Sequence, residues 1–283
     1  MRKIKLMADS SSDLSPEMIK KMNVEIIPLY VIFGDESYKD GVEINPHKLF
    51  QMVDERGALP KTSAITPEDF YKRFKKYTDD GYDILYISIS SGFSSTCQNA
   101  NIAAKDIENG CIRIIDSANL SSGIGLSICY AYDLIQEGYS IDEVVQETEA
   151  ILPKVNTSFI IDTLEFLYKG GRCSAMQSVV SSMLNIRPII KVIDGGMTVG
   201  SKIRGKKKKG FDVMIKEAIA DKDKMIGDRV FITHSLGSEE EEKYIRQELE
   251  KNLPGMKIIT TQASSLISCH CGKKTIGILY IAD

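Results

Sequence analysis

The sequence predicts an α/β fold in two parts. In the first half, short apolar runs with strand character alternate with stretches of helical period, which is typical of βαβ units around a mostly parallel sheet. After about residue 156 the pattern changes, because a Gly195-Gly196 turn joins two apolar runs as in a β-hairpin. We therefore expect a three-layer α/β domain over residues 1–156 and an α/β domain with antiparallel strands over residues 157–283.

The individual elements follow from the same patterns. The strands expected in the first part are Lys3–Met7, Glu25–Phe33, Ile84–Ile89 and Ile112–Ile115. The helices expected there are Pro16–Met22, Pro46–Glu55, Pro67–Asp79, Cys97–Asp106, Ser122–Glu137 and Ile141–Val155. Two of these helices carry start signals, since Thr66 precedes a proline at the first helical position and Ser140 begins a capping box.

The second part mixes strands and helices less regularly. The strands expected there are Ser158–Ile161, Ile189–Ile193, Met197–Ser201, Val230–His234, Lys257–Thr261 and Thr275–Tyr280. The stretches expected to be helical are Leu164–Gly171, Val179–Ile186, Lys207–Ala220 and Glu239–Asn252. A hairpin together with helices predicts a sheet with antiparallel content.

Composition narrows the class of protein. Apolar residues make up 43% of the 283 residues and charged residues 27%, as in soluble globular proteins. A net charge of −3 provides no overall basic field, so we expect no nucleic-acid partner. No apolar run approaches the ~20 residues that span a bilayer. The chain begins directly in a strand, without a signal peptide, and its six cysteines are scattered, which predicts reduced thiols and a cytoplasmic location.

Three expected strands end in turns that are rich in hydroxyl groups. These turns cover residues 8–13, 90–96 and 116–123, and a helical stretch follows each of them. Ligands of open α/β sheets bind beyond the carboxyl ends of the strands, and free N–H groups at a helix start bind anions without lysine or arginine. A phosphate or a carboxylate would fit equally. Ordinary capping of the helices by serine produces the same pattern without a ligand.

Two further segments bear candidate site residues. The loop Pro60–Ala64 carries the hydroxyls of Thr62 and Ser63, which either cap the next helix or face the Ser94 turn. His270, in an expected loop between two strands, could donate a hydrogen bond to an anion. The flanking cysteines invite a metal assignment, but neighbours in an extended chain point to opposite faces and no second ligand pair occurs, so we expect no metal.

Catalysis is the alternative use of these groups. Ser94 and His270 could serve a small-molecule hydrolase or a phosphate-handling enzyme if they meet in space. The chain contains neither a Gly-x-Ser-x-Gly nucleophile elbow nor a phosphate-binding P-loop sequence. The hydrolase therefore stands second to a binding function.

Basic residues gather in one segment, Lys202–Lys209. Such a run either forms a solvated helix start or docks an acidic partner, with at most transient contact to an anionic membrane surface. Lys202 and Arg204 are the docking candidates in this run. Arg172 is a third, because the turn before it presents its guanidinium, which could contact a ligand as readily as a partner.

Several short motifs occur in an order that resembles the DegV family, the fatty-acid-binding (FakB-type) subunits of the bacterial fatty acid kinase system. The resemblance spans nearly the whole chain. Its motifs are Ala8–Leu14, Ile27–Leu29, Pro60–Ser63, Ser91–Thr96, Asp116-Ser117, Leu167–Arg172, Ile186–Ile189, Arg204–Lys207, and His270 with Gly272.

The resemblance implies one long-chain, palmitate-like fatty acid in an apolar tunnel between two α/β domains. It implies that Thr62, Ser94 and His270 bind the carboxylate, with Ser63 and Ser95 as possible further contacts. It also implies a lipid carrier without catalytic residues or other cofactors, which presents the acid to a separate ATP-dependent fatty acid kinase.

The chain departs from the family pattern at three places. Ser95 and Cys97 stand where the family usually has a glycine and an aromatic residue, and Ala64 replaces a glutamine. Lys273-Lys274 replaces a Pro-Gly pair after Gly272. The last change predicts an altered backbone after His270, with two lysines near the mouth of the tunnel.

Overall fold

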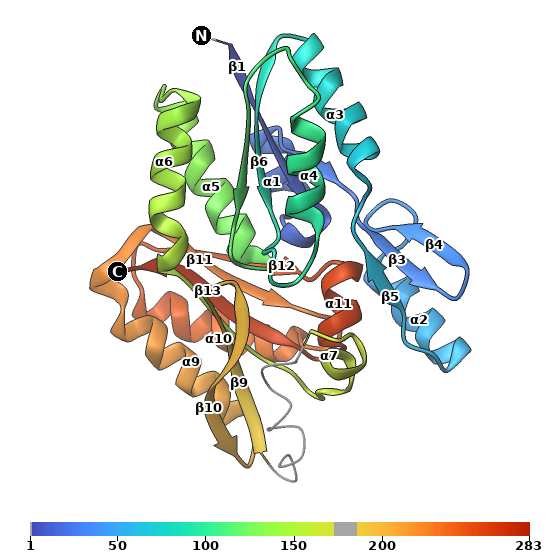
Figure 1. Ribbon diagram of the computed structural model, residues 1–283. Coiled ribbons are helices and arrows are strands. Elements are labelled where there is room, and N and C mark those ends of the chain that lie inside the picture. The colour runs from blue at the N-terminus through green and yellow to red at the C-terminus, as the bar shows by residue number, and fades with distance from the viewer. Residues whose placement is uncertain (1, 173–185) are drawn as a thin grey trace.

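The computed structural model describes residues 2–172 and 186–283, and these residues form three β-sheets with helices around them (Figure 1). The strands are β1 (Lys3–Asp9), β2 (Glu25–Ile27), β3 (Tyr30–Phe33), β4 (Glu36–Lys39), β5 (Lys61–Ser63), β6 (Tyr82–Ser88), β7 (Ile112–Asp116), β8 (Val155–Ile160), β9 (Ile186–Ile193), β10 (Gly196–Arg204), β11 (Met225–His234), β12 (Lys257–Gln262) and β13 (Ile276–Ala282).

The α-helices are α1 (Pro16–Met22), α2 (Pro46–Arg56), α3 (Pro67–Asp79), α4 (Thr96–Ala104), α5 (Ser122–Gln136), α6 (Ile141–Ile151), α7 (Glu165–Lys169), α9 (Lys208–Ala220), α10 (Glu239–Asn252) and α11 (Ser265–Cys271). Short 3-10 helices are η1 (Ser10–Ser12), η2 (Leu152–Lys154) and η4 (Lys222–Lys224).

The first sheet is parallel throughout and has the strand order β2-β1-β6-β7. Side chains alternate along β6, so that Leu85 and Ile87 pack with α5 and α6 while Ile84 and Tyr86 pack with α3 and α4. Helices therefore cover both faces, as Figure 1 shows. The predicted three-layer arrangement of the first part is confirmed.

The second sheet is mixed, with the order β10-β9-β8-β13-β11-β12. Only β11 and β12 run parallel; the other neighbours are antiparallel. Ile276 and Ile278 of β13 pack with α9 and α10, whereas Leu279 and Ile281 face the other way. The predicted antiparallel content is confirmed, and the domain boundary at residue 156 stays a prediction.

Helix α5 lies between the two sheets. Ile128 and Leu126 of this helix share one hydrophobic core with Leu85 of the first sheet. The same core includes Phe231 and Leu279 of the second sheet. A helix that is apolar on nearly all sides must be covered on nearly all sides, and two sheets provide that cover. At its first residue, the Ser122 hydroxyl hydrogen-bonds to those of two threonines on β11 and β12. One core thus spans both parts of the chain.

The third sheet is small and antiparallel, with the order β4-β3-β5. Together with α2 it packs against α11, where Val31 and Phe50 share a core with Cys269. In Figure 1 this unit lies beside α7 and α11. Its strand β5 carries Thr62, which pairs with Val31 of β3.

Two expected elements differ from the prediction at a proline: one strand is divided in two, and one helix ends early. The single strand expected over Glu25–Phe33 is two strands in different sheets, because Pro28 has no N–H with which to continue the ladder. The helix expected to reach Val155 ends at Ile151, and Pro153 lies in the 3-10 turn that follows.

Other expectations on the second part also change. The hairpin turn lies at Asp194-Gly195, one residue before the expected position, and both residues have the positive φ of a type I′ turn. The helix expected over Val179–Ile186 falls outside the described residues, apart from Ile186, which begins β9.

Two predicted loops are regular elements. Lys61–Ser63 of the expected loop Pro60–Ala64 form β5 on the edge of the small sheet. His270 lies on α11 and not in a loop. Both elements are short and depend on partners distant in the sequence, so local patterns do not reveal them.

The shared core predicts that the two parts unfold together. Ile128→Ala removes a fully buried side chain from α5 and should lower the free energy of unfolding by about 2–5 kcal/mol. Urea denaturation followed by circular dichroism should show one transition for the wild type and for the variant. Ile102→Ala, on an exposed position of α4, is the matched control and should change stability by less than about 0.5 kcal/mol. Two separate transitions in the wild type would contradict a shared core.

Candidate ligand pocket

A pocket lies among β5, the turn before α4, the inner face of the second sheet, and α11. Most of its wall is apolar. The apolar side chains that line it are Leu29, Ile89, Phe93, Leu120, Phe159, Leu167, Met197, Leu266, Ile267 and Leu279.

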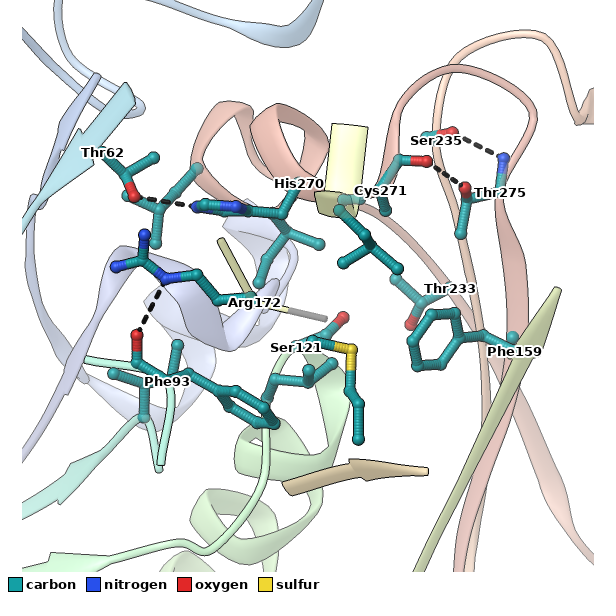
Figure 2. A pocket seen from close by; sticks show the side chains of 18 of the residues that line it. Thr62, Phe93, Ser121, Phe159, Arg172, Thr233, Ser235, His270, Cys271 and Thr275 are labelled. Carbon is teal, nitrogen blue, oxygen red and sulfur yellow. Dashed lines mark hydrogen bonds between the residues drawn. The ribbon is translucent and has the colours of Figure 1, made fainter. Parts of the chain in front are cut away.

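Thr62, Arg172 and His270 lie close together on one side of this pocket, as Figure 2 shows. The hydroxyl of Thr62 lies 2.8 Å from Nε2 of His270. Arg172 lies next to this pair, and Ser94 also lines the pocket. The predicted residues Thr62, Ser94 and His270 therefore share one pocket, although they come from three separate segments of the chain.

Hydrogen bonds fix the segment that carries Ser94 and connect it to the residue after α7. The Ser94 hydroxyl lies 2.7 Å from that of Thr96, at the start of α4. Arg172 donates from Nε to the carbonyl of Phe93 at 3.2 Å, and from Nη1 to that of Gly170 at 2.8 Å. Arg172 thus connects the end of α7 to the Ser94 turn, and it is the one permanent charge in the described lining.

The two supplementary candidates differ in placement. Ser63 lines the pocket, and its hydroxyl donates to the carbonyl of Ala64 at 3.1 Å. Ser95 is exposed and lies outside the described lining. The glycine usual at this position in the family resemblance is therefore not replaced by a side chain that enters the pocket.

Several hydroxyl side chains lie deeper in the wall, but each is engaged by the protein. Thr157 donates to the side chain of Asn119 at 2.8 Å, Thr275 donates to the carbonyl of Cys271 at 2.8 Å, and Thr233 lies 2.9 Å from the Thr261 hydroxyl. Ser235 accepts the N–H of Thr275 at 2.8 Å. These hydroxyls satisfy their hydrogen bonds within the protein, so the wall can contain them without a ligand.

Two buried carboxylates hold the start of the helix that carries His270. Asp13 accepts the N–H of Ser264 at 2.8 Å, and Asp40 accepts that of Ser265 at 3.0 Å. The first N–H groups of a helix have no partner within it, and the helix dipole favours negative charge there. These acids come from turns more than 220 residues earlier in the chain. No local pattern around Ser264 predicts this anchor, because both acids are distant in the sequence.

Asp13 also supports the pocket wall. It accepts the Ser121 hydroxyl at 2.5 Å, and Ser121 lines the pocket with a positive φ of 55°. Burial raises the pKa of Asp13 to about 7, because the charged form loses its hydration, while the hydrogen bonds from Ser121 and Ser264 oppose that effect. The nearby Asp40, whose pKa is also raised by burial, adds repulsion.

His270 is neutral in this environment. Burial and, to a smaller extent, the positive charge of Arg172 together lower its pKa to about 4. Its ring packs directly on Gly170, where a Cβ would lie 2.4 Å from Nδ1. Only glycine fits at position 170, whereas Gly171 has a positive φ of 71° and no atom within 4 Å of an added Cβ.

The lysines after Gly272 do not line the pocket. Lys273 forms an ion pair with Asp54 of α2 at 2.9 Å. Lys274 has a φ of 59°, so this lysine adopts the left-handed conformation that glycine adopts at no cost. The predicted change of backbone after His270 stays a prediction, since Lys274 adopts a conformation that the usual glycine would adopt as well.

The basic segment lies apart from the pocket lining. Lys202 and Arg204 are exposed on β10, and only Lys208 and later residues belong to α9. Lys207 is partly buried, and burial lowers its pKa although Asp162 opposes this effect. The run is thus a strand edge and a helix start, and not a helix start alone.

The described residues contain neither a candidate metal site nor a helix that could span a membrane. No cluster of three or more histidine, cysteine, aspartate or glutamate side chains there could hold a metal ion. Within the same residues, no helix has the length and apolarity needed to cross a membrane.

Comparison with known proteins gives the family. The family model described as "Uncharacterised protein, DegV family" matches residues 3–283 of this chain. The chain belongs to the DegV family. DegV domain-containing proteins of Clostridium perfringens and Clostridium acetobutylicum are 32% and 34% identical to it, over 100% and 99% of both chains.

Solved DegV structures share the fold. A fatty-acid-binding DegV family protein from Thermus thermophilus superposes with a TM-score of 0.91 at 30% identity, and the fatty acid binding protein DegV from Bacillus subtilis with 0.91 at 26%, both over 100% of each chain. A stearic-acid-binding protein from Eubacterium ventriosum gives 0.89 at 26% identity, over 99% of this chain and 98% of the other. These matches confirm the predicted fold class.

The environment of His270 predicts that the free energy of unfolding falls as the pH is lowered. Its pKa of about 4 lies below the ~6.5 of an unfolded chain, so between these values the unfolded state binds one more proton. The contribution of the neutral imidazole to the free energy of unfolding should therefore be lost as the pH falls from ~6.5 to about 4. NMR should show an imidazole that does not titrate between pH 5.5 and 8.

The matched variant His270→Gln isolates this effect, because Asp13 and other acids titrate equally in both proteins. The stability difference between wild type and variant should shrink as the pH falls from 6.5 toward 4. An imidazole that titrates near 6.5 in the folded protein would contradict the burial of His270.

Proposed function

We propose that this protein binds one long-chain, palmitate-like fatty acid in the pocket and presents its carboxylate to a separate ATP-dependent fatty acid kinase. The observation that carries the proposal is the division of the pocket into an apolar wall and a polar end that contains Thr62, Ser94, Arg172 and His270. Relatives of known structure that bind fatty acids support the same ligand class.

The tail would provide most of the affinity. Each CH₂ group that leaves water contributes ~0.8 kcal/mol, and the wall that would receive the tail keeps its hydroxyls engaged elsewhere. The carboxylate would lie at the polar end. A carboxylate oxygen near Thr62 and His270 could accept from the hydroxyl and from Nε2 when that nitrogen bears the proton, in place of their mutual hydrogen bond.

The charge of the polar end suits a carboxylate that must later react. Arg172 supplies one positive charge near the site, while the hydroxyls and the neutral imidazole supply donors. A single anion is thus balanced, and neutral donors leave its oxygens accessible to a phosphoryl group from a partner.

The same contacts disfavour the hydrolase. The Ser94 hydroxyl pairs with Thr96, and Nε2 of His270 pairs with Thr62, so the described hydrogen bonds include none between a serine hydroxyl and an imidazole. A general base works best when its pKa lies near the working pH, and the pKa of His270 is about 4. We therefore propose a carrier without catalytic residues of its own, working in the cytoplasm.

Substitution of Ser94 tests the carboxylate site. Protein purified from bacterial cells should release long-chain fatty acid on lipid extraction and mass spectrometry. Ser94→Ala should weaken palmitate binding by about tenfold or more, since a hydrogen bond to an ionised group contributes ~1.5–3 kcal/mol.

Two controls sharpen this test. Ser95→Ala changes the exposed neighbour and should leave the affinity within about twofold. Methyl palmitate, which lacks the charge, should bind wild type and Ser94→Ala about equally. Wild-type protein that carries no fatty acid and does not bind palmitate would overturn the proposal.

Charge reversal tests the partner surface. Lys202→Glu with Arg204→Glu changes two exposed basic positions on β10 and should slow ATP-dependent acyl phosphate formation by a fatty acid kinase, while palmitate affinity stays unchanged. Lys222→Glu with Lys224→Glu alters net charge equally at other exposed positions and serves as the control. Equal rates for the two double variants would remove this surface from the proposal.

A further inference from the structure

The turn that presents Ser94 is organised by Ser90, which does not line the pocket itself. The carbonyl of Ser90 accepts the N–H groups of Phe93 at 3.0 Å and of Ser94 at 3.2 Å. Its hydroxyl accepts the N–H of Gly92 at 3.1 Å. Ser90 is 1% exposed, so these bonds are protected from water. The backbone position of Ser94 therefore follows from that of Ser90.

The position of Ser90 depends in turn on the β9–β10 hairpin. The Ser90 hydroxyl donates to the carbonyl of Gly195 at 2.7 Å, across 105 residues of sequence. Gly92 lies so close to the same carbonyl that a Cβ on Gly92 would be 2.4 Å from its oxygen. Both groups are backbone, and neither can move aside as the end of a side chain could. Two backbones thus meet at a point where only glycine fits.

The hairpin that provides this contact also belongs to the pocket. Met197 lines the wall two residues after Gly195. The tip of the hairpin is a type I′ turn, and its left-handed residues Asp194 and Gly195 hold the carbonyl in a defined direction. One hairpin therefore contacts both the apolar wall and the support of the polar end.

We propose that Ser90 and the Gly195 carbonyl form a clasp that positions the Ser94 hydroxyl for the carboxylate. Ser90 is then a positioning residue, which affects the headgroup without touching it. The inference rests on the proposed function for its ligand. The clasp between Ser90, Gly92 and Gly195 is independent of which anion binds.

The test compares binding of palmitate and methyl palmitate to delipidated protein. Ser90→Ala removes the donor to Gly195, and Gly92→Ala forces the backbones apart. Each should weaken palmitate binding about tenfold, as Ser94→Ala does, and change methyl palmitate binding less than twofold. The double variant Ser90→Ala with Ser94→Ala should lose no more than Ser94→Ala alone, because the two residues act through one contact.

Gly196→Ala is the matched control on the same hairpin. Gly196 has no positive φ, and its added Cβ would meet its nearest neighbour, the carbonyl of Ile193, at an ordinary 3.8 Å. This variant should bind both ligands as the wild type does. If Ser90→Ala or Gly92→Ala weakened both ligands equally, or left palmitate binding intact, the clasp would not position Ser94.

Amide hydrogen exchange separates failure of the clasp from failure of the proposed ligand. The N–H groups of Phe93 and Ser94 should exchange at least tenfold faster in Ser90→Ala and Gly92→Ala than in the wild type or Gly196→Ala, with no ligand present. Unchanged exchange would overturn the clasp even if palmitate binds. Faster exchange in a protein that binds no palmitate would overturn the proposed ligand and leave the clasp in place.

Discussion

The structure depends on the burial of α5 between two sheets. Because Ile128 and its neighbours on this helix pack against residues of both, the two parts of the chain share one core and cannot separate without exposing it. The pocket lies next to the start of this helix, where Leu120 and Ser121 line its wall. The shared core thus fixes the inner face of the second sheet relative to the turns of the first, and the pocket is the space that remains between them.

Within that frame, buried polar groups place the groups of the polar end. Asp13 and Asp40 anchor α11 by its first N–H groups, and α11 carries His270 to the pocket. Burying carboxylates costs free energy, as the raised pKa of Asp13 records, and their hydrogen bonds to backbone and hydroxyl donors offset part of that cost. Such an arrangement fixes a short helix that its own sequence would not stabilise, since isolated helices of this length are marginal in water.

This dependence on distant contacts explains which predictions succeeded. The periodic elements of the first part, such as Pro67–Asp79 and the capping box at Ser140, occur as expected because their signals are local. Thr62 and His270 were associated with the site through the family motifs, but the elements that carry them were predicted as loops. β5 exists only by pairing with β3, and α11 only with acids from the start of the chain. The sequence left Arg172 open between partner docking and ligand contact, since its place in the lining depends on contacts to Phe93 and Gly170.

Burial and the neighbouring charge of Arg172 keep His270 neutral. Arg172 lies beside the imidazole and, together with burial, keeps its pKa near 4, so the polar end carries one positive charge and not two. A second cation beside Arg172 would add repulsion between two like charges in a poorly hydrated site. Gly170 completes the arrangement, because the absence of a side chain lets the uncharged ring pack against backbone where a charged ring would need water. The hydroxyls and the imidazole can then donate to an anion while Arg172 alone balances its charge.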